Sequence, residues 1–149
     1  VEDSRMPRLY REAPLMSVWE GSGNVAALDT LRAAAKQPGS LEVFFPELDT
    51  ARGSDHRYDA FVDELGSAFT DLETMEHRAR RVVGDMAIAL QGSLLLRHGH
   101  PAVADAFAAS RLGRDRGDVF GTLPTGLDLT PIIERATPKG TGETQAVIA

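Results

Sequence analysis

The sequence predicts an all-α fold, a helical bundle of about five helices. Apolar residues recur at every third or fourth position between residues 55 and 98, which is the spacing of one face of a helix. No segment shows the alternation of apolar and polar residues that marks a half-buried strand. With 149 residues, the chain is long enough for one domain with a helical core.

Residues 1–23 are predicted to form a loop, because prolines and glycines interrupt them at Pro7, Pro14, Gly21 and Gly23. A helix is expected over about 24–37, with Asn24 near its N-cap and Pro38-Gly39 ending it. Its predicted inward stripe consists of Val25, Leu28, Leu31 and Ala35. The apolar cluster 41–45, which ends at Pro46, is interpreted as a short helix or turn packed into the core.

The longest periodic segment is divided into two helices, over about 55–70 and 71–98. The break is placed at Thr70-Asp71-Leu72-Glu73, which has the form of a capping box. The predicted inward positions of the two helices are Tyr58, Phe61, Val62, Leu65, Phe69, Leu72, Met75, Ala79, Val82, Val83, Met86, Leu90 and Leu94.

Glycine and proline also divide the last third of the chain. Gly99 ends the long helix, and Pro101 opens a helix over about 101–112. The inward residues of that helix are predicted to be Ala104, Phe107, Ala108 and Leu112. Residues 113–126 are expected to be a loop, and Thr130-Pro131 to start a short helix that reaches Ala136. From Pro138 onward the chain is polar, and it is predicted to be disordered.

Composition excludes several classes of function. The net charge of −6 and the pI near 5.2 argue against nucleic-acid binding by the whole surface. They do not exclude binding by a local basic patch. The chain has no cysteine, which excludes disulfides and thiolate metal sites and is in keeping with a cytoplasmic location. No apolar run approaches the ~20 residues of a membrane span. The chain begins at Val1 without a signal peptide and is predicted to be a piece of a larger protein.

A turn with two glycines carries the clearest chemical signal. Trp19 and Glu20 precede Gly21-Ser22-Gly23, where glycine allows backbone N–H groups to approach a ligand closely. A carboxylate beside an aromatic side chain can have a raised pKa and act as a general base. The alternative, which spacing alone favours, is a solvated Glu20 in a loop before a helix.

The order of the residues around this turn points to a family. Arg8-Leu9-Tyr10-Arg11-Glu12, the turn itself and Leu28-Asp29-Thr30-Leu31-Arg32 together resemble the C-terminal region of the acyl-CoA dehydrogenase family, over about residues 5–32. Within that family they are similar to the alkylation-response, AidB-like branch. A weaker resemblance to the helical tail of this branch runs from 107–112 through 120–124 to 132–136. The sequence departs from the family's usual Tyr-Glu-Gly-Thr at Trp19 and Ser22.

The resemblance implies a division of the chain and a set of roles. Residues 1–37 would be a loop plus the last helix of the family's C-terminal bundle, 38–137 an AidB-like helical extension and 138–149 a disordered tail. Glu20 matches the catalytic base in the family members that carry it on this segment, and Trp19 matches a residue that lines the acyl pocket. Gly21, Ser22 and Gly23 match a segment that contacts FAD, whereas Arg8 and Arg11 would order the nearby loop.

The resemblance also implies partners. The longer protein would use FAD to dehydrogenate an acyl-CoA thioester, pass electrons to an acceptor and form a homo-oligomer. The piece alone is predicted to be inactive and to bind no FAD, because the flavin-holding domains lie elsewhere. The alternative function is a non-catalytic helical module for oligomerisation or DNA interaction.

A short basic segment, His77, Arg78, Arg80 and Arg81, lies in the predicted long helix, and Arg111, Arg114 and Arg116 follow in the tail. The resemblance to the AidB-like branch allows Arg78, Arg80 and Arg81 to contact the phosphates of double-stranded DNA. The favoured alternative is a solvated face neutralised by the pairs Glu73–His77 and Glu76–Arg80.

The histidines do not predict a metal site. His98-Gly99-His100 has no acidic residue at ligand spacing on the same turn, and His56 is remote in sequence. His98 instead suits the C-terminus of the long helix, where a positive charge is favourable.

Overall fold

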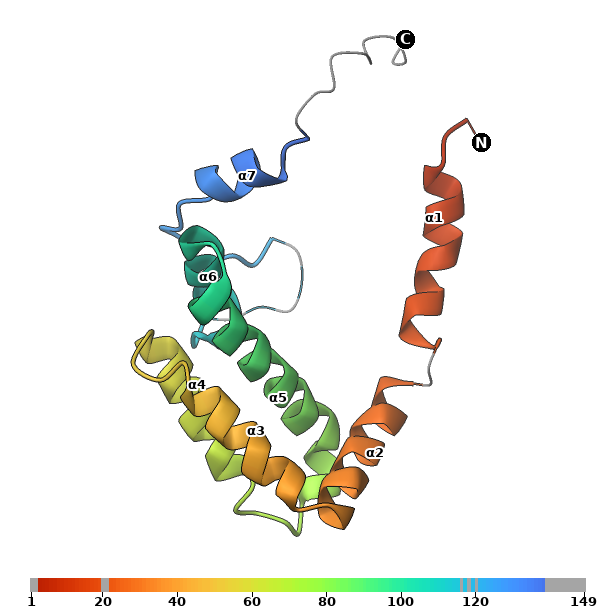
Figure 1. The fold of residues 1–149 in the computed structure, drawn as a ribbon. Coiled ribbons are helices and arrows are strands. Elements are labelled where there is room, and N and C mark those ends of the chain that lie inside the picture. Colours follow the sequence, from red (N-terminus) through yellow and green to blue (C-terminus); the bar gives the residue numbers. More distant parts are fainter. Residues whose placement is uncertain (1–2, 20–21, 116, 118, 120, 139–149) are drawn as a thin grey trace.

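The computed structural model describes residues 3–19, 22–115, 117, 119 and 121–138. These residues form seven α-helices and no strand, which confirms the all-α class and corrects the expected number of helices from about five to seven. In chain order the elements are α1 (Met6–Glu12), the 3-10 helix η1 (Ala13–Ser17), α2 (Gly23–Lys36), α3 (Gly39–Asp49), α4 (His56–Ala68), α5 (Met75–His98), α6 (Pro101–Phe107), the π-helix η2 (Ala108–Leu112) and α7 (Thr130–Ala136) (Figure 1).

The long helix α5 is the centre of the fold. It contacts α2, α3, α4, α6 and η2 (Figure 1). The core lies mainly between α3, α4, α5 and η2, and its buried members are Leu48, Ala51, Tyr58, Phe61, Val62, Leu65, Met75, Val82, Ala89, Ala108 and Leu112. Most of the inward positions predicted for the two long helices are therefore buried or half-buried. Leu72 and Leu94 are exposed, so the prediction is wrong for these two.

The predicted N-terminal loop is wrong, because residues 6–17 are helical. Pro7 lies in the first turn of α1 and Pro14 in the first turn of η1. Proline is tolerated there because the N–H that it lacks would have no partner inside the helix. Neither helix buries a residue, and α1 stands away from the body formed by α3 to α6 (Figure 1).

Helix α2 begins at Gly23, with Ser22 rather than Asn24 at the N-cap. Only part of its predicted stripe faces the body. Ala27 is buried and Leu31 packs against the core, but Val25, Leu28 and Ala35 are exposed. Because α2 lies at the edge of the body and packs mainly on α5, with a smaller contact to α3, one face of it is covered.

The apolar cluster of residues 41–45 belongs to helix α3, which continues through Pro46 to Asp49. The expected end at Pro46 is therefore wrong. The rings of Phe44 and Phe45 meet edge to face at 5.6 Å, and Phe45 meets Phe69 at 5.4 Å. These aromatic contacts and the fully buried Leu48 hold the helix against the core on both sides of the proline.

The break between α4 and α5 lies where it was expected, but the capping box does not form. Helix α5 starts at Met75, and the Thr70 hydroxyl donates back to the Ser67 carbonyl. Asp71 instead accepts a hydrogen bond from the Thr74 N–H at 3.2 Å. Asp71 lies three residues before the N-cap, Thr74, and its side chain bonds to the nearby backbone in place of the predicted bond from Thr70.

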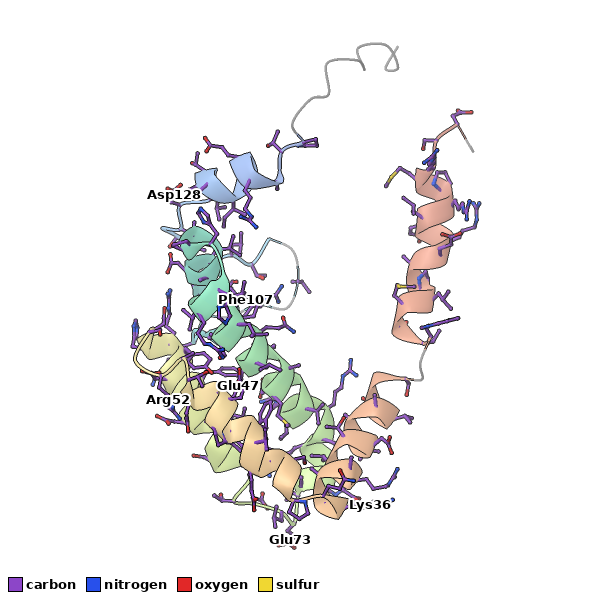
Figure 2. The ribbon with its side chains drawn as sticks, viewed as in Figure 1. Lys36, Glu47, Arg52, Glu73, Phe107 and Asp128 are labelled. Carbon is purple, nitrogen blue, oxygen red and sulfur yellow. The ribbon has the colours of Figure 1, made fainter. Side chains whose placement is uncertain are left out.

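The remaining boundaries agree with the sequence. Helix α5 ends at His98 before Gly99, α6 starts at Pro101 and η2 continues it to Leu112. Ala104, Ala108 and Leu112 are buried, and Phe107, labelled in Figure 2, packs against the core. Residues 139–149, which carry most of the predicted disordered tail, lie outside the described residues. Among the described residues, every helix is too short or too polar to cross a lipid bilayer.

A charged cluster ties α4 to α6. Asp55 is the N-cap of α4 and accepts from the Arg57 N–H at 2.8 Å. The Arg57 guanidinium pairs with Asp55 at 2.6 Å and with Asp105 of α6 at 2.7 Å. The hydrogen bond from the Arg57 side chain holds the pKa of Asp55 below its usual value.

Replacing Asp55 by Asn is expected to flatten the acid dependence of stability. A carboxylate with a lowered folded-state pKa stabilises the fold above about pH 4, and this contribution is lost as the pH falls toward the folded-state pKa. Asn still caps the helix, so the loss at pH 7 should stay below about 1 kcal/mol. Urea unfolding at pH 7 and pH 3 checks this, and an unchanged difference between the two pH values would contradict it.

Candidate functional site

The motif turn, Trp19–Gly23, connects η1 to the start of α2. Trp19 is 69% exposed, and Ser22 and Gly23 lie at the N-terminus of α2. The Ser22 side chain makes no capping hydrogen bond to the first turn of α2. Glu20 and Gly21 lie outside the described residues, and their roles as base and flavin contact stay predictions.

Arg8 and Arg11 lie on α1, which leads into this turn. The Arg8 Nε donates to Glu12 Oε1 at 2.7 Å, one helical turn along, and both side chains are exposed. Arg11 lies in the last turn of α1, where a positive charge suits the helix dipole. Both arginines therefore lie within α1, where they suit the helix itself. Their predicted role in ordering a site near the motif turn stays a prediction.

The segment before α2 exposes an unusual amount of apolar surface. Its large exposed side chains are Met6, Leu9, Tyr10, Leu15, Met16, Val18 and Trp19. Large apolar side chains exposed at this density in one short segment favour a contact with another protein or domain. The apolar and basic hollows described below are formed by other described residues, and neither is lined by Trp19, Ser22 or Gly23.

An apolar groove of about 550 Å³ lies between α2, α3 and the start of α5. Its lining includes Leu28, Leu31, Leu41, Phe69, Leu72 and Met75. This groove explains why Leu28 and Leu72, both expected in the core, are exposed. Figure 2 shows Lys36 and Glu73 at the same end of the molecule as this groove.

A second hollow, of about 620 Å³, is basic. His77, Arg80, Gly84 and Ile88 follow one face of α5, and Arg81 lies beside them. Helix η2 adds Arg111, and Asp85 is the acidic residue in the lining. We call this surface, which also includes Arg78, the basic hollow. It gathers five cationic or titratable basic side chains around one depression, as a polyanion would require.

The three arginines predicted to contact phosphates differ in their surroundings. The Arg78 Nη2 donates to the carbonyl oxygens of Ala68 at 3.2 Å and Asp71 at 2.6 Å, so Arg78 holds the α4–α5 loop. The Arg80 guanidinium lies against Gly23 of α2. Arg81 makes no side-chain hydrogen bond or ion pair with the described residues, which leaves it available in the basic hollow.

The neutralising pairs expected along α5 are wrong. In the described part of the chain, Glu73 does not pair with His77, and Glu76 does not pair with Arg80. Glu73 lies before the start of α5 at Met75, so the helical spacing that would bring it to His77 is lost. The face itself is solvated as this alternative expected, since His77, Arg80 and Arg81 are exposed, but the two neutralising pairs do not form among the described residues.

The histidines have local roles or exposed positions. His100 is the N-cap of α6, and its Nδ1 accepts from the Ala102 N–H at 3.2 Å. His98 lies in the last turn of α5. Over the described residues, no group of three His, Asp or Glu side chains is arranged to hold a metal ion.

One member of the basic hollow, Asp85, was not among the candidate residues, whereas Arg111 was named beside the basic segment. Asp85 is one turn after Arg81 on α5, so a plot of the helix faces would have placed it there. Arg111 comes from η2, and its arrival depends on how η2 packs beside α5. Arg114, its neighbour in sequence, lines a different hollow with Phe61 and Glu64.

Comparison with known proteins gives one informative similarity. No family model matches the chain, and no solved structure matches it. The chain is 33% identical over 106 residues to a protein of Escherichia coli (strain K12) named "Putative acyl-CoA dehydrogenase AidB". The similar region covers 71% of this chain and 19% of that protein, so the chain spans about a fifth of the length of the relative. This similarity supports placing the chain in the acyl-CoA dehydrogenase family.

Proposed function

We propose that the chain is the C-terminal helical part of a longer, FAD-dependent acyl-CoA dehydrogenase, called the longer protein below. The observation that carries this proposal is the motif turn at the start of α2, in a chain similar to an AidB protein over 71% of its length. On this proposal, 1–37 complete the catalytic bundle, 38–137 form a helical extension and 138–149 form a tail.

The chemistry assigned to the turn is the removal of two hydrogens from an acyl thioester. The Glu20 carboxylate would accept the proton from the α-carbon. FAD, held in part by Gly21, Ser22 and Gly23, would supply the acceptor for the hydride of the β-carbon, so that the product carries a C=C bond. A carboxylate next to Trp19, shielded from water once substrate is bound, suits the proton transfer. The exposed Trp19 ring would lie along the acyl chain.

The described residues fit one side of a flavin site. The N–H groups at the start of α2, which Ser22 does not cap, are donors that would suit the polar edge or the phosphates of FAD. A flavin site buries most of its ligand, and Trp19, on the described part of the turn, is largely exposed. FAD and acyl-CoA are therefore assigned to the longer protein, whose other domains would cover the exposed apolar side chains of α1, η1 and α2.

Flavin content tests this assignment. The longer protein, purified and reconstituted with FAD, is expected to hold near-stoichiometric flavin, and the 149-residue chain alone is expected to hold none. Flavin absorbance of the two purified samples measures the difference. A longer protein that retains no flavin after reconstitution would remove the dehydrogenase proposal.

A second candidate function, contact with double-stranded DNA or another polyanion, is favoured by the basic hollow. Its members His77, Arg80, Arg81 and Arg111 gather on one face in a chain whose overall charge is −6. Phosphate contacts by such side chains release counterions, so binding would weaken steeply as salt is added.

Replacing Arg81 by Met is expected to flatten the salt dependence of duplex binding. Each lost phosphate contact lowers the slope of log K against log salt by about 0.9. Arg32→Met is the matched control, since Arg32 has the same charge but lies on α2 and pairs with Asp29 at 2.9 Å. Fluorescence anisotropy with a labelled duplex at several salt concentrations measures both slopes, and equal slopes would remove the basic hollow from any DNA contact.

A further inference from the structure

We propose that the apolar groove between α2, α3 and the start of α5 is the docking site of an amphipathic helix from the part of the longer protein that lies outside this chain. The inference rests on the proposed function only in taking the chain as one part of that longer protein. It extends the contact already assigned to α1, η1 and α2 onto the predicted extension, residues 38–137. Docking at this groove fixes the extension to the catalytic bundle.

Helix α2 forms one wall of the groove, whose volume is about 550 Å³. Leu28, Leu31 and Ala35 line it from one face of α2, at helical spacing, and Ala34 lies beside them. Val25, one turn before Leu28, continues this face and is exposed. The groove is therefore continuous with the uncovered face of α2, which the proposed function assigns to a contact with the catalytic bundle.

The opposite wall belongs to the predicted extension. It is lined by Leu41 of α3, Phe69 at the end of α4 and Leu72 of the loop before α5. Leu72 is 72% exposed, although it lies between two helices of the body. Because this leucine borders several other apolar side chains around one hollow, the surface suits contact with a further apolar element.

The shape and charge of the groove favour a helix as its occupant. Ala34 and Ala35 are small, so another helix can approach α2 at the short end of the 8–10 Å spacing of packed helices. The charged lining residues are Arg32 of α2 and Glu76 of α5. Arg32 pairs with Asp29 at 2.9 Å, whereas Glu76 forms no ion pair with the described residues. The expected occupant therefore has apolar residues at positions i, i+3, i+4 and i+7 and a basic residue that faces Glu76.

The described residues of the chain leave this groove uncovered. Helix α1 extends away from the end of α2 that carries Lys36, and α7 contacts α6 at the other end of α5 (Figures 1 and 2). The chain spans about a fifth of the length of its relative. On the proposed function, the rest of the catalytic bundle lies in the remaining length, next to the uncovered face of α2. The occupant is therefore assigned to the longer protein rather than to a second copy of this chain.

The absence of cysteine from the chain allows a direct test by thiol labelling. Leu72→Cys and Val43→Cys each place one thiol at a position that is 72% exposed, and Val43 lies on α3 outside the groove lining. N-ethylmaleimide labelling followed by peptide mass spectrometry gives the rate at each position in the 149-residue chain and in the longer protein. Both positions are exposed in the chain, so both variants should fold like the unmutated protein.

We expect position 72 to react at least about 10-fold more slowly in the longer protein than in the chain, because labelling then requires the docked helix to open. Position 43 should react at the same rate in both proteins. An equal ratio of rates at the two positions would overturn the proposal. Labelling at position 72 that slows as the concentration of the 149-residue chain is raised would also overturn it, in favour of a second copy as the occupant.

Flavin content separates this result from the test of the dehydrogenase proposal. A longer protein that protects position 72 but retains no FAD after reconstitution would confirm the docking and remove the dehydrogenase proposal. An FAD-loaded longer protein in which position 72 reacts as fast as in the chain would overturn the docking alone.

Discussion

Replacing Glu20 by Gln in the longer protein is expected to slow flavin reduction by acyl-CoA by about 10²- to 10⁴-fold, because Gln cannot accept the α-proton. Gln keeps the size of the side chain, and the flavin contacts assigned to this turn come from the backbone and Ser22. Binding of FAD and of acyl-CoA should therefore survive. Stopped-flow absorbance under anaerobic conditions measures the rate, and equilibrium titration measures the two affinities.

Glu12→Gln is the matched control for this variant. Glu12 lies on α1, is exposed and pairs with Arg8, so the same change there should leave the rate unaltered. A Glu20→Gln protein that reduces its flavin at the unmutated rate would remove Glu20 from the mechanism. Loss of FAD from the variant would instead assign Glu20 a structural role.

Replacing Tyr58 by Ala is expected to destabilise the fold by about 3–5 kcal/mol, the scale of deleting a buried aromatic side chain. Tyr58 is fully buried, and its hydroxyl donates to the Leu48 carbonyl at 2.8 Å. A methyl group on Gly92 would lie 3.3 Å from the Tyr58 ring and 3.1 Å from Leu112, so α5 and η2 close tightly around it. Chemical denaturation followed by circular dichroism measures the free energy of unfolding.

Two further variants make this measurement specific. Tyr58→Phe removes only the hydroxyl and should cost about 1 kcal/mol. Tyr10→Ala removes the other tyrosine of the chain, which is 82% exposed on α1, and should change stability by less than about 0.5 kcal/mol. Equal losses for Tyr10→Ala and Tyr58→Ala would contradict the position of the core described here.

Much of the fold was predictable because apolar residues recur at helical spacing in the helices that pack against the core. The limits of α2, α4 and α6 follow from apolar spacing and from glycine and proline at their ends. The N-terminal helices were missed because proline was interpreted as a helix breaker, although Pro7 and Pro14 lie in first turns. The exposure of Val25 could not be predicted, since it depends on α2 lying at the edge of the body.

The candidate site also has a part that the sequence predicts and a part that depends on tertiary packing. The motif turn was recognisable from the order of its residues, because the chemistry there depends on neighbours in sequence. The meeting of Arg81 with Arg111 in the basic hollow depends on how η2 packs beside α5. The apolar groove depends on how α2 packs on α3 and α5, and neither packing can be read from local spacing.

Anaerobic addition of acyl-CoA thioesters of several chain lengths to the FAD-loaded longer protein tests the central claim most directly. The assignment predicts that at least one thioester bleaches the flavin absorbance and that the matching enoyl-CoA product appears in equal amount. An FAD-loaded protein whose absorbance no thioester changes would contradict the dehydrogenase assignment and favour the helical interaction module.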